Sequence, residues 1–151
     1  MYLVDTNVIS ASAPTKTAAP LELVAWMERN SDRLYLSVVT IAEIEDGIAK
    51  AGREGARWKA TRLAQWLETM LHLYSARILV LDVRVAQLVG QLSDVARGRG
   101  QAPGFADLVI AATARSRGYV VLTRNLRHFT TLDVPAHDPF ASLPFASLPS
   151  A

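Results

Sequence analysis

Short apolar segments recur along the chain, and each is followed by a stretch whose apolar side chains are spaced as on a helix. The apolar segments are uninterrupted, whereas a strand with one solvent-facing side would alternate apolar and polar residues. Uninterrupted runs are typical of strands that are covered on both faces. We therefore expect four buried strands, at residues 2–4, 34–37, 78–81 and 119–122.

The segments between these strands carry helical periodicity. Apolar side chains at intervals of three and four residues form one stripe over residues 63–74 and another over residues 85–96. A narrower stripe lies at residues 41–48, and Pro20 is expected to open a further helix. Strands that alternate with helices in this way predict an α/β domain with a mainly parallel central sheet flanked by helices.

The composition is that of one globular domain. The chain has 151 residues, of which 50% are hydrophobic and 20% charged, and a chain of this size buries roughly two-thirds of its unfolded surface. A disordered chain is excluded, and the absence of cysteine excludes thiolate catalysis and cysteine-bound zinc. We expect the domain to span residues 1–140, followed by a Pro-, Ser- and Ala-rich tail at 141–151 that contains the near-repeat ASLPF–ASLPS.

The sequence carries no export or membrane signal. Asp5 interrupts the N-terminal apolar run too early for a secretory signal, and no apolar run approaches the ~20 residues of a membrane-spanning helix. We therefore expect a soluble, cytoplasmic protein with no membrane partner. The net charge of +2 indicates an anionic partner only weakly, although 13 of the 16 basic residues are arginine, which binds phosphate with two hydrogen bonds.

Three carboxylates and one amide occupy equivalent places in the strand–helix pattern. Asp5 directly follows the first strand, Glu43 lies just past the second, Asp107 opens the helix expected at residues 105–114, and Asn125 follows the last strand. Because the carboxyl ends of parallel strands meet at one edge of a sheet, and ligands bind at that edge, these groups are expected to share one cleft.

Structural roles are open for three of these residues. The segment Thr40–Glu43 reads as a capping box, in which Glu43 would return a bond to the Thr40 amide. Asp5 would cap a helix or form an Asx-turn, and Asn125 would occupy a left-handed turn position. Each role competes with a place in the cleft.

Asp107 has a weaker structural alternative. It is the only carboxylate in the segment FADLVIAATA, and the small residues Ala111 and Ala114 lie on its helix face. A desolvated carboxylate costs several kcal/mol unless it is paired or bound to metal, and a helix N-terminus offsets only part of that cost. We therefore expect a metal-binding or catalytic role for Asp107.

The three carboxylates together indicate a cation. Carboxylates in one cleft raise one another's pKa values unless a cation neutralises them, and an all-oxygen set suits Mg²⁺ or Mn²⁺. Without these three residues, 16 basic side chains stand against 11 acidic ones, a balance of +5. This remainder favours a polyanionic substrate that is bound through its backbone.

The histidines and the basic run at residues 53–62 carry less information. No two of His72, His128 and His137 have the spacing of a zinc site. His128 is expected in a turn or at the surface, with assistance to the cleft as the lesser alternative. The basic run is expected to be a solvated helix face, with RNA contact as the minority interpretation.

Four segments resemble the motifs of PIN-domain ribonucleases, in particular the VapC/FitB-type toxins of bacterial type II toxin–antitoxin pairs. They are MYLVDTNVIS, SVVTIAEIEDGI, FADLVIAATA and LTRNLRHF, in the order of the family and at compatible spacing. The resemblance extends from Met1 to about Phe140, and DVPAHDPF looks like the closing strand and turn of the family. It implies the PIN-domain fold, with three α/β/α layers.

The resemblance also implies residue roles. The acidic residues of the family match Asp5, Glu43 and Asp107, which would hold Mg²⁺ or Mn²⁺ for hydrolysis of RNA phosphodiester bonds. The fourth family position, often Asp, is Asn125 here, and His128 stands where another acidic residue is common. Asn125 would hold a water or the scissile phosphate, and the missing carboxylate argues against a second tightly bound metal. Supporting roles are expected for Thr6, Asn7 and Thr123.

The partners that the resemblance implies are a cognate antitoxin, which blocks the cleft, RNA as substrate, and promoter DNA bound indirectly through the antitoxin. It also implies a homodimer. Other classes compete with this hypothesis. A receiver domain needs adjacent acidic residues near the first strand and a lysine after the last strand, and this sequence has neither. A haloacid-dehalogenase-type phosphatase needs a second Asp at the position that Asn7 occupies here, so this pattern is not met either. An inactive PIN fold that binds a partner or nucleic acid is the remaining alternative.

Overall fold

A computed structural model describes residues 1–16 and 19–144 of the chain. Its centre is a five-stranded sheet in the order β3-β2-β1-β4-β5, in which every neighbouring pair is parallel. The strands are β1 (Tyr2–Val4), β2 (Leu34–Ser37), β3 (Ile78–Leu79), β4 (Val120–Leu122) and β5 (Ala136–His137). The predicted parallel sheet is confirmed, and β5 lies in the segment expected to close it.

Two strand boundaries differ from the sequence prediction. β3 ends at Leu79, not at residue 81, because the chain leaves the sheet and exposes Val80 by 59% and Leu81 by 39%. β4 begins at Val120, not at Tyr119. The cause lies in α6 (Phe105–Arg117), whose end at Gly118 uses a positive φ of 69° and pairs the Tyr119 amide with Ala114.

The predicted helical stripes lie on helices of the structure. The stripe at residues 41–48 lies on α3 (Val38–Arg53) and that at 85–96 on α5 (Val83–Gly98). The stripe at 63–74 lies on α4 (Arg57–Leu73), except for its last residue, Tyr74, which is the C-cap of that helix. Pro20 is the N-cap of α2 (Leu21–Arg29) and not its first residue. The remaining helices are α1 (Thr6–Ile9) and α7 (Leu126–Thr130), with two short 3-10 helices at Ser10–Ser12 and Ser31–Arg33.

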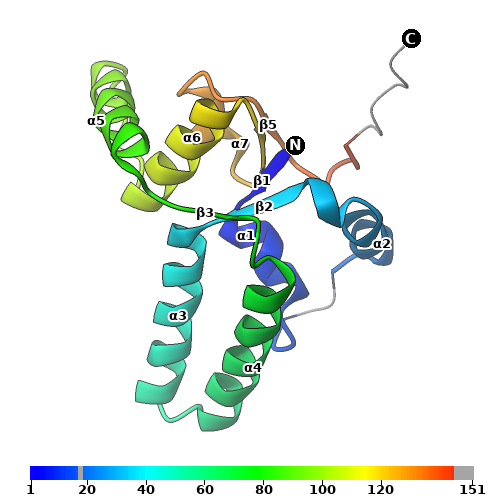
Figure 1. Cartoon of the computed structure of the whole chain (residues 1–151). Helices are drawn as coiled ribbons and strands as arrows, with labels where there is room; N and C mark the ends of the chain where they lie inside the picture. Colours follow the sequence, from blue (N-terminus) through cyan, green and yellow to red (C-terminus); the bar gives the residue numbers. More distant parts are fainter. Residues whose placement is uncertain (17–18, 145–151) are drawn as a thin grey trace.

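The helices cover both faces of the sheet and so form three layers (Figure 1). Leu3 and Val121 pack against α5 and α6 in one apolar core, whereas Val4 and Leu122 pack against α1, α2, α3 and α4 in a second. Consecutive strand residues therefore point into different cores, and both are fully buried. This two-sided burial explains why the strands are apolar without alternation.

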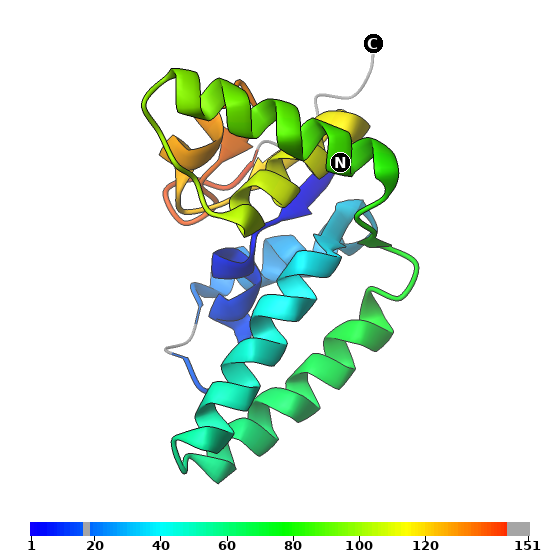
Figure 2. The ribbon, with the colours of Figure 1, turned by 90° about the vertical axis from the view of Figure 1, so that its left-hand side faces the viewer.

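The carboxyl ends of β1, β2 and β4 lie at one edge of the sheet because these strands are parallel neighbours. α1 starts at that edge after β1, α3 starts after β2, and α7 starts shortly after β4. α3 and α4 form a hairpin that extends well beyond the sheet (Figure 2). Residues that begin these helices are thereby brought together.

The C-terminal segment is described as far as Pro144. Phe140 and Leu143 pack against the second core, while the whole of the second ASLP unit lies outside the described residues. The boundary at residue 140 therefore stays a prediction. None of the described helices combines the length and the apolar character that crossing a bilayer requires.

Candidate active site

An open cavity of about 260 Å³ lies at the carboxyl edge of the sheet. It contains all four polar residues whose convergence the sequence predicts, although they come from segments up to 120 residues apart. α1, α3, α6 and the segment after β4 each contribute to its wall. The lining residues are Asp5, Thr6, Asn7, Ser10, Glu43, Asp107 and Asn125.

Asp5 is the buried carboxylate of this cavity, with 4% of its surface exposed. Its backbone amide donates to the carbonyl of Leu122 at 2.9 Å, which fixes the end of β1 against β4. Its Oδ1 accepts from the Thr6 amide at 2.7 Å, and its Oδ2 accepts from Thr123 Oγ1 at 2.7 Å and from Asn7 Nδ2 at 3.0 Å. The predicted helix-capping role is therefore correct for Oδ1, and Asp5 lies in the cavity as well.

The environment of Asp5 disfavours its negative charge. Burial raises the pKa of its carboxyl group above the usual value of 3.8. Hydrogen bonds from Thr123 and Thr6 oppose this rise, and the negative charges of Asp107 and Glu43 add to it. A cation in the cavity would relieve both the desolvation and the repulsion.

Glu43 does not form the capping box that its sequence context suggests. The helix begins three residues earlier than that motif requires, because Ser37 is the N-cap of α3 and accepts from the Val39 amide at 3.2 Å. Thr40 is buried within the helix, and the hydroxyl of Thr6 lies within hydrogen-bond distance of Thr40 Oγ1 (3.2 Å) and donates to Glu43 Oε2. Glu43 is exposed and turned toward α1.

Asp107 is in the first turn of α6, as expected, but it is less buried than expected. Its side chain is 21% exposed, and its Oδ2 lies 2.8 Å from Nδ1 of His128 on α7. The prediction of burial rests on the apolar residues around Asp107 in the sequence. The first turn of α6 is nevertheless open to solvent, and Phe105 in that turn is 62% exposed. The desolvated carboxylate of the site is Asp5.

Asn125 and Asn7 connect β4 to β1. The Asn125 amide donates to Thr123 Oγ1 at 2.9 Å, and Asn7 Oδ1 accepts from the Arg124 amide at 3.2 Å. Thr123 is fully buried and therefore holds both Asp5 and the turn in which Asn125 sits. The left-handed conformation predicted as an alternative for Asn125 is wrong, since its φ is −99°.

His128 is the residue that the sequence interpretation undervalued. Its exposed position agrees with the predicted surface placement, but its contact with Asp107 is not part of that prediction. The available signal was its position three residues after Asn125 in a short helical turn, which places both residues on one face. Isolated histidines without a metal-type spacing give no stronger indication.

The donor chemistry of the cavity fits a hard divalent cation. Carboxylate, amide and hydroxyl oxygens surround it, and these are the ligands of Mg²⁺ and Mn²⁺. Across residues 1–16 and 19–144, no three His, Asp or Glu side chains already stand close enough to hold one ion. Glu43 and Asp107 are instead engaged with Thr6 and His128.

Comparisons with known proteins place these features in one family. A sequence model of the PIN domain matches residues 2–134. The protein named Toxin FitB of Neisseria gonorrhoeae is 35% identical over 144 residues, covering 93% of this chain and 99% of that protein. VapC ribonuclease Y4jK of Sinorhizobium fredii is 31% identical over 144 residues, covering 93% and 98%.

Solved structures show the same architecture. The crystal structure of FitAcB from Neisseria gonorrhoeae matches with a TM-score of 0.78 and 36% identity over 93% of this chain and 99% of that chain. The crystal structure of DNA-bound VapBC from Salmonella typhimurium matches with a TM-score of 0.76 and 26% identity over 91% and 96%. Both likenesses span nearly the whole described chain.

Proposed function

Because this chain belongs to the PIN-domain family, we propose that it is a metal-dependent endoribonuclease and the toxin of a toxin–antitoxin pair. The observation that carries the proposal is the meeting of Asp5, Glu43 and Asp107 in one cavity, with Asp5 buried. The names of two relatives, a toxin and a VapC ribonuclease, support the same activity. Action on RNA would place the protein in the cytoplasm.

We assign the ion, Mg²⁺ or Mn²⁺, to Asp5 and Asp107 as direct ligands and to Glu43 directly or through a water. When bound, such an ion neutralises the carboxylates, polarises a phosphoryl oxygen and lowers the pKa of a water. For ligation, Glu43 and Asp107 must release or share their contacts with Thr6 and His128. The raised pKa of Asp5 supports the assignment, since a cation is what would stabilise its charge.

The residues of the chain then have separate tasks. Glu43, exposed at the mouth of the cavity, would orient the attacking water and accept its proton. Asn125 would hold that water or the scissile phosphate, while Thr6, Asn7 and Thr123 keep the Asp5 and Glu43 oxygens in place. His128, the partner of Asp107, would orient that carboxylate.

The proposed partners are a cognate antitoxin that covers the cavity, and promoter DNA that is bound through the antitoxin. Solved relatives are recorded as the FitAB complex on an IR36 DNA fragment and as DNA-bound VapBC. We propose that this chain forms a homodimer. Co-expression with the product of a short reading frame immediately upstream would test the antitoxin, which should copurify with the chain and suppress cleavage.

Induced expression with mapping of RNA ends tests the activity in cells. The chain with its own sequence should create new RNA ends at defined positions and arrest growth, and Asp107→Ala should do neither at the same protein level. Equal RNA ends from both forms would refute the assignment of Asp107. An absence of new ends from either form would favour the inactive PIN fold.

A further inference from the structure

A groove of about 270 Å³ runs from the active-site cavity along the hairpin of α3 and α4. It shares Thr6, Ser10 and Glu43 with that cavity, so the two are continuous. One wall includes residues 13–16, and the other is the hairpin, which extends beyond the sheet (Figure 2). A strand leaving the carboxylates in this direction would enter the groove directly.

All three lysines of the chain line this groove. Lys16 comes from the loop, Lys50 from α3 and Lys59 from α4, whereas the other 13 basic residues are arginines. Glu54 is the one acidic lining residue besides Glu43, and it lies 4.0 Å from Lys50 with both side chains 60% exposed. Such an exposed pair is weak, so Lys50 remains available to a ligand. Apart from Glu43, three lysines stand against one glutamate, and the groove therefore carries a net positive charge.

Small and large apolar residues line part of the groove. Gly47 and Ala51 leave space along α3, and an added Cβ on Gly47 would have no neighbour within 4 Å. Trp66 offers an aromatic surface against which a base can stack. Thr15 Oγ1, the one buried side-chain polar atom without a partner in the described residues, is also in its wall.

We propose that this groove binds the single-stranded RNA segment adjacent to the scissile phosphate, with the lysines contacting phosphates and Trp66 a base. The inference rests on the proposed ribonuclease function and assigns the path of its substrate. Lysine is a compact charge on a flexible stem and imposes no bidentate geometry. Contacts of this kind position a strand without reading its sequence.

The continuity with the carboxylates favours RNA over an acidic peptide as occupant. A substrate must continue past the cavity on at least one side, and the groove supplies positive charge and a stacking surface there. Proteins that bind single-stranded nucleic acid combine these two features. An acidic amphipathic peptide is the competing occupant and is included in the test.

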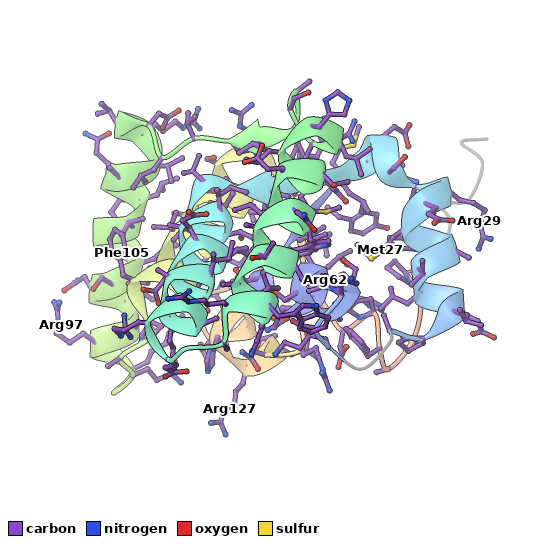
Figure 3. The ribbon with its side chains drawn as sticks, turned by 90° about the horizontal axis from the view of Figure 1, so that it is seen from below. Met27, Arg29, Arg62, Arg97, Phe105 and Arg127 are labelled. Carbon is purple, nitrogen blue, oxygen red and sulfur yellow. The ribbon has the colours of Figure 1, made fainter. Side chains whose placement is uncertain are left out.

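The test removes two charges without touching the active-site cavity. The double variant Lys50→Gln/Lys59→Gln is made in an Asp5→Asn background, so that the RNA stays intact, and a fluorescein-labelled single-stranded RNA is titrated by anisotropy. Loss of two phosphate contacts should weaken binding roughly 25-fold at about 0.1 M salt and reduce the log–log salt slope by about 1.4. The control is Arg29→Gln, an exposed charge on α2 that points away from α3 and α4 (Figure 3) and should leave affinity and slope unchanged.

A second variant fills the groove and keeps its charge. Gly47→Leu places a side chain in the open space, and it also improves helix propensity within α3, so unfolding would not explain lost binding. RNA affinity should fall while the temperature of unfolding stays level or rises. Unchanged affinity in both the lysine and the glycine variants would overturn the proposal.

Two further results separate this proposal from the others. If the lysine variant loses RNA affinity as expected but the chain with intact Asp5 cuts no RNA, the proposed function fails and the groove assignment stands. If the chain cuts RNA and the lysine variant binds and cuts like its parent, the groove assignment fails alone. If the lysine variant lost binding to a peptide of alternating Glu and Leu but bound RNA like its parent, the groove would be a peptide site and the proposal would be overturned.

Discussion

Replacing Thr123 by valine should weaken both the fold and the metal site, because one buried hydroxyl supports both. Thr123 is fully buried, and its Oγ1 donates to Asp5 Oδ2 at 2.7 Å while accepting from the Asn125 amide at 2.9 Å. Valine preserves the volume and removes these two bonds, together with the weaker one that Oγ1 accepts from Asn7 Nδ2 at 3.3 Å. A hydrogen bond to a charged group contributes ~1.5–3 kcal/mol, and the Asn125 amide can turn to water because that residue is exposed.

We therefore expect Thr123→Val to lower the free energy of unfolding by about 2 kcal/mol, measured by urea denaturation. Asp5 would also lose the donor that orients Oδ2. Loss of a hydrogen-bond partner that orients a metal ligand typically lowers metal affinity or activity 10–100-fold. The Mg²⁺ concentration for half-maximal RNA cleavage should accordingly rise at least about tenfold.

A matched control is available on α6. Thr113 is 1% exposed, and its hydroxyl donates to the Val109 carbonyl at 2.7 Å, away from the site. Thr113→Val removes a neutral bond, which should cost no more than about 1 kcal/mol and leave the Mg²⁺ requirement unchanged. If the two variants behaved alike in both assays, the reasoning about Thr123 would be wrong.

Three further predictions concern the carboxylates. Glu43→Gln retains an acceptor for Thr6 and should change stability by no more than about 0.5 kcal/mol, yet slow RNA cleavage by about 100-fold or more; near-parental cleavage would remove Glu43 from the mechanism. His128→Ala should reduce cleavage roughly 10–100-fold by freeing Asp107, and His128→Asn, which can still donate, should restore part of it; equal rates in the two variants would show that this hydrogen bond is irrelevant. Because folding raises the pKa of Asp5 above 3.8, the folded state holds this proton more tightly than the unfolded state. In EDTA, the free energy of unfolding of the parent, measured in urea, should therefore fall relative to that of Asp5→Asn as pH rises from about 3.8 to the folded pKa, and the difference should stay constant above that pH. A parent that instead gains stability relative to Asp5→Asn over this pH range would contradict the burial argument.

The fold is largely predictable because apolar patterning determines it directly. The bounds of β1 are predicted correctly, and those of β4 to within one residue, because an uninterrupted apolar run indicates a strand that is buried on both faces. The lengths of short edge elements are not predictable in this way. β3 has the same apolar run as the others, but Val80 and Leu81 leave the sheet, and nothing in the run itself marks that departure.

The site is predictable in membership and not in detail. That strand ends converge follows from a parallel sheet, so Asp5 and Asn125 could be placed together from sequence. Which carboxylate is buried depends on tertiary packing, and the structure gives this role to Asp5 where the sequence suggested Asp107. The contact of His128 with Asp107 likewise requires knowing that α7 folds back against α6.

RNA cleavage by the purified chain, with Mg²⁺ and with EDTA, is the most direct test of the central claim that the carboxylate cavity hydrolyses RNA. The chain should cut a single-stranded RNA with Mg²⁺ and lose this activity in EDTA, and Asp5→Asn should cut no faster than the uncatalysed background while circular dichroism shows it folded. Cleavage by Asp5→Asn at the parental rate, or cleavage that EDTA leaves unchanged, would contradict the account.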